Sequence, residues 1–179
     1  MSRSQRATRI LLIGMMGSGK SSVGRALAAR TGWLFLDNDA LVERASGRTA
    51  RQLLADEGEA ALREAESAAL DAGLGVEPPS IIGVAGGVLL KPVDRRRVAA
   101  GGFVVWLRAP AEVLAARAVG AEHRPWLDGD AVAWFRRTLA ERGPLYAEVS
   151  DLEVDTAAST PSEAAEAIVA ALASLPSES

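Results

Sequence analysis

The chain of 179 residues is 49% hydrophobic and 24% charged, a composition ordinary for a globular protein, and its length suits one domain and is short for two. Its formal net charge of −3 does not suggest a nucleic-acid-binding surface, and no apolar run approaches the ~20 residues that a membrane span needs. The absence of cysteine excludes disulfides, thiolate chemistry and cysteine-ligated zinc, and it is compatible with a reducing cytosol, so we expect a cytoplasmic protein.

A phosphate-binding loop is predicted between the first strand and the first helix. The apolar run at 9–13 has the length of a buried strand, and residues 14–21 fit the pattern G-x-x-x-x-G-K-[ST]. A helical pattern follows over 22–30, and its N-terminus would add partial positive charge to the backbone N–H groups of the loop. Lys20 would bridge the outer phosphates of a nucleotide, and the Ser21 hydroxyl would be a ligand of Mg²⁺. The alternative is a glycine-rich turn without a ligand. The chain uses arginine at almost every other basic position and has only two lysines, so a lysine here favours a phosphate site, which a compact charge suits.

Two acidic residues, Asp37 and Asp39, follow the second predicted strand at 33–36. Because ligands collect at the carboxyl ends of strands in open α/β sheets, both carboxylates should lie near the phosphate loop. A carboxylate there can hold the Mg²⁺ shell, and another can accept a proton from an attacking hydroxyl. The alternative is that they cap the next helix, predicted over 40–46, and Asp39 can do both.

A long helix is predicted over 59–70, after a break at Gly58. Arg63 lies beside the apolar face of this helix. Its spacing fits a surface ion pair with Glu59 at i−4 or Glu66 at i+3, and spacing alone favours that pairing over a functional role.

Paired glycines, Gly86 and Gly87, follow the third predicted strand at 80–85. Glycines in this place allow a ligand to approach the backbone closely, and a tight turn explains them equally well. The strand does not end in an acidic residue, which speaks against the large motor ATPases.

Arginines occur in a segment without apolar periodicity, residues 119–130, and at its entrance. This segment follows a helix that begins at Pro110 and ends near Arg117. Arg117 and Arg124, with glycines nearby, suit a lid that closes over phosphates, and a solvated basic loop is the alternative. We expect His123, the one histidine, to be a solvated lid residue and not a catalyst.

The last part of the chain alternates again between helical and strand patterns. Apolar residues over 131–141 predict a helix whose inward face ends in Arg142, so an acidic partner or an anionic ligand should meet that charge. A capping box at 160–163 begins the last helix. With further strands at 103–107 and 152–154, the pattern predicts an α/β fold with a five-stranded parallel sheet.

Six motifs in this order resemble those of the shikimate kinases, over about residues 10–168. They are the phosphate loop with Val23-Gly24-Arg25 after it, Asp37-x-Asp39, Gly58-Glu59-x-x-Leu62-Arg63-x-x-Glu66, Ala85-Gly86-Gly87, Arg124-Pro125-Trp126-Leu127 and Arg142-Gly143-Pro144-Leu145-Tyr146. The resemblance implies a three-layer fold like that of the P-loop nucleoside-monophosphate kinases, with a mobile lid at about 118–130. It also implies ATP-dependent phosphoryl transfer to the 3-hydroxyl of shikimate, giving shikimate 3-phosphate and ADP.

The resemblance also implies roles for the residues of the acceptor site. Asp39 would contact the ring hydroxyls and act as the base. Arg63 and Arg142 would hold the substrate carboxylate, which reverses the interpretation of Arg63 from spacing. The backbone amides of Gly86 and Gly87 would contact the ring.

For the nucleotide, the resemblance implies that Arg124 moves toward the transferring phosphate and that Arg117 stacks on adenine. The predicted catalytic residues are Lys20, Asp39 and Arg124. The predicted ATP-binding residues are Gly17, Ser18, Gly19, Lys20, Ser21, Ser22, Arg117 and Arg124, and the predicted metal ligands are Ser21 and Asp37.

The sequence departs from the family pattern at four positions. Leu54 and Leu62 stand where the family has phenylalanine, Ala85 replaces a glycine, and Trp126 replaces a leucine in the lid. The loss of two aromatic rings would widen the pocket, so another ring polyol acid or a cyclitol is the alternative acceptor. We place shikimate first because polar anchors discriminate between substrates more strongly than apolar walls.

We therefore expect a single kinase domain over residues 1–179, with residues 1–8 as a frayed tail. Its substrates would be ATP and shikimate and its cofactor Mg²⁺, and it would be a monomer that binds neither nucleic acid nor membrane. The competing classes are a sugar-acid or nucleoside kinase of the same fold, a regulatory GTPase, and a nucleotide-binding protein without catalysis.

Overall fold

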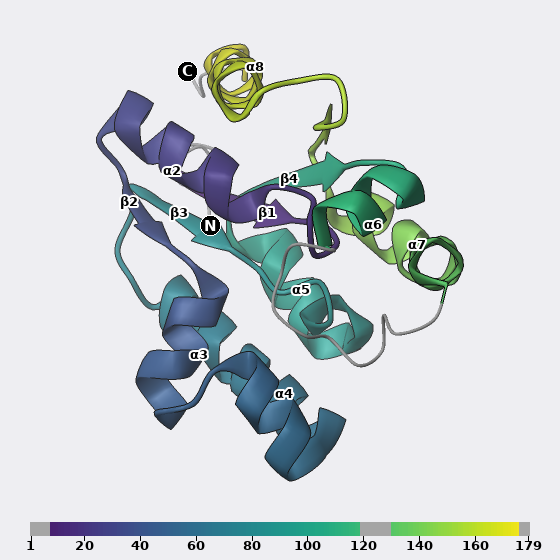
Figure 1. The fold of residues 1–179 in the computed structure, drawn as a ribbon. Helices are drawn as coiled ribbons and strands as arrows, with labels where there is room; N and C mark the ends of the chain where they lie inside the picture. Colours follow the sequence, from purple (N-terminus) through teal and green to yellow (C-terminus); the bar gives the residue numbers. More distant parts are fainter. Residues whose placement is uncertain (1–7, 119–129, 176–179) are drawn as a thin grey trace.

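A parallel sheet is the centre of the fold. In residues 8–118 and 130–175, which a computed structural model of the protein describes, five strands form this sheet in the order β2-β3-β1-β4-β5 (Figure 1). The strands are β1 (Arg9–Ile13), β2 (Leu34–Leu36), β3 (Ser80–Gly83), β4 (Phe103–Arg108) and β5 (Leu152–Asp155). Each neighbouring pair is parallel, which confirms the predicted fold class. Because β1 lies between β3 and β4, the loop that follows β1 leaves the sheet at its centre.

Helices cover both faces of the sheet, so the fold has three layers (Figure 1). They are α2 (Lys20–Thr31), α3 (Asn38–Ser46), α4 (Ala50–Leu74), the short 3₁₀ helix η1 (Val88–Leu90), α5 (Pro92–Gly101), α6 (Ala111–Ala118), α7 (Ala131–Val149) and α8 (Pro161–Ala173). The helices α2 and α8 pack on one face, and α4, α5 and α7 pack on the other. Among the described residues, no helix is both long and apolar enough to cross a bilayer.

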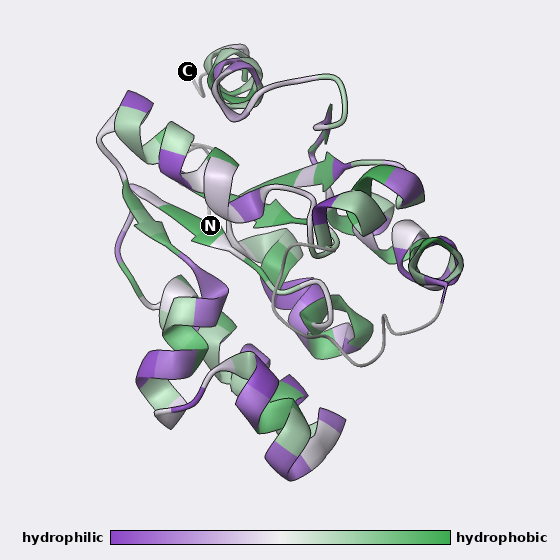
Figure 2. Ribbon diagram, in the orientation of Figure 1, coloured by the Kyte–Doolittle hydropathy of each residue, from purple (hydrophilic) through white to green (hydrophobic). Residues whose placement is uncertain are grey.

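The alternation of side chains along β1 explains why both faces need a helical cover. Ile10 and Leu12 belong to the core under α2 and α8, whereas Leu11 and Ile13 belong to the core under the other helices. All four are fully buried. The strands are hydrophobic and the outer surfaces of the helices carry the polar residues (Figure 2). Burial on both faces holds the end of β1 firmly, and the phosphate loop starts there.

A separate small core joins α3 to α4, on both sides of the break in α4. Its buried residues are Val42, Leu53 and Ala69. The helix α4 is interrupted at Gly58, whose φ of 85° and ψ of −179° are not helical, as the predicted break requires. This satellite core lies at one end of the molecule, beside the sheet (Figure 1).

The predicted elements are confirmed except at some boundaries. The helix α3 begins at Asn38 instead of residue 40, because Asp37 is its N-cap. The helix α7 does not end near residue 141: it continues through Pro144 to Val149. Proline removes one backbone hydrogen bond, but Tyr146 and Val149 beyond it are buried, so packing keeps the segment helical. Residues 1–7 of the expected tail and residues 119–129 of the expected lid lie outside the described residues.

Candidate active site

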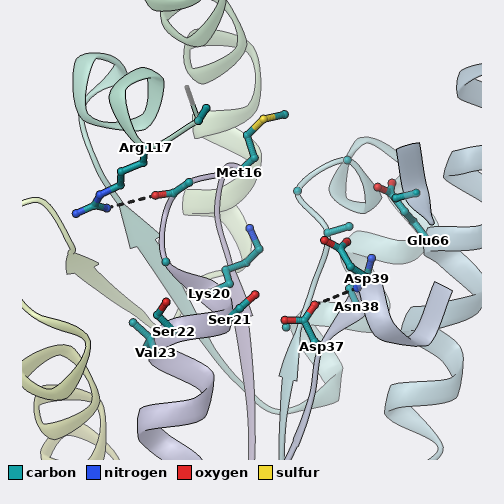
Figure 3. Close-up of a pocket in the computed structure, with 18 of the residues that line it drawn as sticks. Met16, Lys20, Ser21, Ser22, Val23, Asp37, Asn38, Asp39, Glu66 and Arg117 are labelled. Atoms are coloured by element: carbon teal, nitrogen blue, oxygen red, sulfur yellow. Dashed lines mark hydrogen bonds between the residues drawn. The ribbon is translucent and has the colours of Figure 1, made fainter. Parts of the chain in front are cut away.

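A cavity of about 1370 Å³ opens at the carboxyl ends of the central strands. Nearly every predicted site residue that the structure describes lines it. These residues are Gly17, Gly19, Lys20, Ser21, Ser22, Asp37, Asp39, Arg63, Gly86, Gly87, Arg117 and Arg142. Figure 3 shows Lys20 and Ser21 on one side and Asp37, Asp39 and Glu66 on the other. Ser18 is the exception, because it is fully buried and does not line the cavity. Arg124 lies outside the described residues.

The phosphate loop is shaped by glycine and by Lys20. Gly17 and Gly19 have φ of 76° and 93°, values that side chains rarely allow. Gly19 is the N-cap of α2 and makes no side-chain cap, so the first N–H groups of the helix remain available for an anion. The Lys20 ammonium donates to the carbonyls of Gly14 and Met15, at 2.9 and 3.0 Å. The loop therefore presents a cation and backbone donors to one side of the cavity.

Arg117 lies beside the phosphate loop, close to Gly17 (Figure 3). Its guanidinium donates to the Gly17 carbonyl at 3.3 Å and to the Thr156 carbonyl at 2.6 Å. Thr156 is buried, and its hydroxyl donates to the carbonyl of Ser18 at 3.0 Å. Thr156 was not predicted as a site residue from the sequence, although its place directly after the fifth strand was an available signal. Together these contacts hold the Arg117 guanidinium against the loop, beside the cavity.

Both acidic residues after β2 line the cavity, but only Asp37 is a helix cap, because Asp39 lies inside α3. Asp37 is the N-cap of α3, and its Oδ1 accepts from the backbone N–H of Asp39 at 3.1 Å. Both carboxylates line the cavity opposite Lys20 (Figure 3). The described residues hold no group of three or more acidic or histidine ligands that could enclose a metal alone. Mg²⁺ suits such a site, because it binds through one or two protein oxygens and takes the rest from phosphates and water.

Arg63 lies at the other end of the cavity and makes both of its predicted ion pairs. Its Nη1 is 2.7 Å from Glu66 Oε2, and its Nη2 is 2.8 Å from Glu59 Oε1. The side chain is nonetheless only 19% exposed and lines the cavity. A Cβ on Gly87 would overlap its guanidinium. Both predicted ion pairs are therefore confirmed, although the side chain lines the cavity beside the buried Glu66 and not the outer surface. Its role in acceptor binding stays a prediction.

Arg142, on α7, lines the same end of the cavity as Arg63. Its Nε is buried without a hydrogen-bond partner, and among the described residues no carboxylate lies within ion-pair distance. Burial raises the pKa of Glu66, as does the negative charge of Asp39, whereas Arg63 and Arg142 lower it, with a raised pKa as the net result. Glu66 was not predicted as a site residue from the sequence, although it lies one turn after Arg63. Arg63 is already paired with Glu66 and Glu59, whereas Arg142 has no carboxylate partner among the described residues, so Arg142 is the cation left for an anionic ligand.

This arrangement defines a class of protein. A phosphate loop shares one cavity with two carboxylates and two arginines, so the site suits a P-loop kinase that acts on a small anionic acceptor.

The comparisons with known proteins specify the family. The family model described as shikimate kinase matches residues 16–173. The chain is 44% identical to the shikimate kinase of Paramagnetospirillum magneticum over 153 residues, covering 85% of this chain and 77% of that protein. It is 39% identical to the shikimate kinase of Halorhodospira halophila over 171 residues, covering 95% and 96%. The chain belongs to the shikimate kinase family.

Solved structures agree with this assignment. The shikimate kinase of Acinetobacter baumannii in complex with shikimate has a TM-score of 0.88 and 30% identity, with 95% of each chain covered. A gluconokinase from Sinorhizobium meliloti has a TM-score of 0.66 and 26% identity, with 96% of this chain and 94% of that one covered.

Proposed function

We propose that this protein transfers the γ-phosphoryl group of ATP to the 3-hydroxyl of shikimate, giving shikimate 3-phosphate and ADP. The observation that carries the proposal is the single cavity that joins Lys20 to Asp39, Arg63 and Arg142. Its two ends differ in chemistry: the loop offers donors for phosphates, and the far end offers guanidiniums and a carboxylate for a hydroxylated acid. The match to the shikimate-bound structure from A. baumannii supports the same acceptor.

The proposed roles follow from charge and position. Lys20 would stabilise the negative charge on the transferring phosphoryl group. Asp39 would orient the attacking hydroxyl and accept its proton, because it is a carboxylate on the cavity wall opposite the loop. Arg63 and Arg142 would bind the acceptor carboxylate. Positioning of the two substrates would supply most of the catalysis, as in other phosphoryl transfers.

Ser21 and Asp37 would hold the Mg²⁺ that accompanies ATP. The Ser21 hydroxyl and the Asp37 carboxylate line the same cavity from opposite sides, with Ser21 next to Lys20 (Figure 3). When bound, Mg²⁺ would neutralise part of the phosphate charge.

The direct test is a coupled ADP-release assay with purified protein, ATP and Mg²⁺. We expect turnover with shikimate and little with gluconate, quinate or a set of cyclitols. The similarity to a gluconokinase and the aliphatic Leu54 and Leu62 in the cavity wall favour a polyol acid as the second candidate. A kcat/KM for gluconate or quinate above that for shikimate would replace shikimate with that acid.

Changing Gly87 to alanine is expected to damage acceptor binding and spare the fold. Gly87 has φ of −75° and ψ of −22°, which alanine accepts, but the new Cβ would displace the Arg63 guanidinium. We expect KM for shikimate to rise by roughly tenfold, the effect of losing a charged hydrogen bond, with little change in Tm. Gly75→Ala is the matched control, because Gly75 has φ of −72° and ψ of −16° and does not line the cavity. An unchanged KM in Gly87→Ala would remove Arg63 from the acceptor site.

Several expectations remain predictions. They are the single kinase domain over residues 1–179, the lid at about 118–130 with Arg124 as a catalytic residue, adenine stacking by Arg117, the monomeric state and the cytoplasmic location.

A further inference from the structure

Tyr146 is a fully buried polar side chain between the two ends of the active-site cavity. It lies on α7, one turn after Arg142, and none of its surface is exposed. Its ring packs edge to face against Trp106 of β4, with 5.6 Å between centroids. None of the proposed catalytic roles involves it.

The hydroxyl of Tyr146 contacts both sides of the site. It donates toward the Gly86 carbonyl at 3.3 Å and toward Met15 Sδ at 3.4 Å, so one proton is shared between an acceptor-side residue and a phosphate-loop residue. Arg142, one turn earlier on the same helix, acts on this hydroxyl through its charge. Met15 also receives the Lys20 ammonium on its backbone carbonyl, at 3.0 Å. One oxygen therefore links the phosphate loop to the paired glycines.

Gly86 fits closely between this hydroxyl and the loop. A Cβ placed on Gly86 would lie 2.6 Å from the Tyr146 hydroxyl oxygen and 2.9 Å from the Gly14 carbonyl oxygen. The backbone of Gly86 thus touches the phosphate loop on one side and the tyrosine on the other. Close contacts of this kind fix a separation, because packed interiors deform little.

The hydroxyl keeps its proton in this environment. Burial raises the pKa of Tyr146, and although Arg142 and Arg63 lower it, the net direction is upward. A neutral hydroxyl can donate its proton to the Gly86 carbonyl.

We propose that Tyr146 is a positioning residue for the phosphoryl transfer: its hydroxyl sets the distance between the phosphate loop and the acceptor-binding residue Gly86. The inference rests on the proposed function, because Gly86 matters for turnover only if the acceptor binds there. In phosphoryl transfer the protein contributes mainly by placing the two reacting groups, so a small error of placement lowers the rate more than the binding of either substrate.

The test is Tyr146→Phe, which removes the hydroxyl and keeps the ring and its packing. We expect kcat to fall by ~10-fold, KM for ATP to stay within about twofold, and KM for shikimate to rise by about threefold as the Gly86 backbone loses its fixed position. All three constants are measured well below Tm, so that unfolding does not contribute.

Phe135→Leu is the matched control for stability. Phe135 is fully buried on the same helix and in the same core, carries no polar group and does not line the cavity. We expect this variant to lower Tm by several degrees and to keep kcat within about twofold of wild type. A larger fall in kcat for Tyr146→Phe than for Phe135→Leu at equal folded fraction supports positioning.

Two outcomes would overturn the inference. One is a wild-type kcat in Tyr146→Phe, and the other is an equal fall in kcat in both variants, which would assign Tyr146 a purely structural role. Failure of the proposed function is distinguishable, because wild-type protein would then lack turnover with shikimate before any variant is compared.

Discussion

Replacing Lys20 with alanine is expected to lower kcat by ~10²-fold or more while the fold survives, because phosphoryl transfer depends on stabilising charge on the phosphates. Lys20 lines the cavity, and its ammonium donates to the Gly14 and Met15 carbonyls of its own loop. Its removal therefore takes away a charge without opening the core. Steady-state turnover with shikimate and a circular-dichroism melt of the same preparation check both parts.

Lys91→Ala is the matched control, because Lys91 is the one other lysine in the chain. It pairs with Glu64 on the outer surface and does not line the cavity. We expect its kcat to equal that of wild type. Turnover near the wild-type rate in Lys20→Ala would refute the proposed kinase mechanism.

Alanine at Arg142 or Arg63 is expected to weaken acceptor binding by ~1.5–3 kcal/mol each, the range for a hydrogen bond to a charged group. Arg142 should give the larger effect, because no carboxylate of the described residues pairs with it, whereas Glu59 and Glu66 already neutralise part of Arg63. Arg63→Ala should also lower Tm, since Glu66 would lose its ion-pair partner in a buried place. Isothermal titration with shikimate measures the affinities.

Arg137→Ala serves as the control for the loss of one arginine from α7. Arg137 is exposed on the same helix and does not line the cavity. We expect shikimate affinity to be unchanged in it. If Arg142→Ala and Arg63→Ala weakened only ATP binding, the acceptor end of the cavity would be wrongly assigned.

Local patterns in the sequence predicted the features that depend on neighbours along the chain. The strand at residues 9–13, the break at Gly58 and the capping box at Thr160 each follow from residue type and spacing, and the structure confirms them. The ion pairs of Arg63 are of the same kind, since helical spacing alone brings Glu59 and Glu66 beside it.

Features that depend on packing between distant segments could not be predicted in this way. Spacing cannot show that Arg63 also faces Gly87, which lies 24 positions further along the chain. Nor can it show that Tyr146 reaches Met15 across 131 positions, or that burial beyond Pro144 keeps α7 helical. Thr156 supports Arg117 through contacts 39 positions apart. The proposed role of Arg63, binding of the acceptor carboxylate, came from the resemblance to the shikimate kinases, because such a comparison carries information about the folded chain.

The satellite core of Val42, Leu53 and Ala69 has a consequence for how new acceptors can arise in this fold. The wall formed by α3 and the start of α4 is held by its own few side chains, apart from the two layers that fix the nucleotide end. Substitutions in that wall, such as at Leu54, therefore reshape the acceptor pocket with little effect on the stability of the sheet. Selection can then change which molecule is phosphorylated while the binding of ATP stays constant.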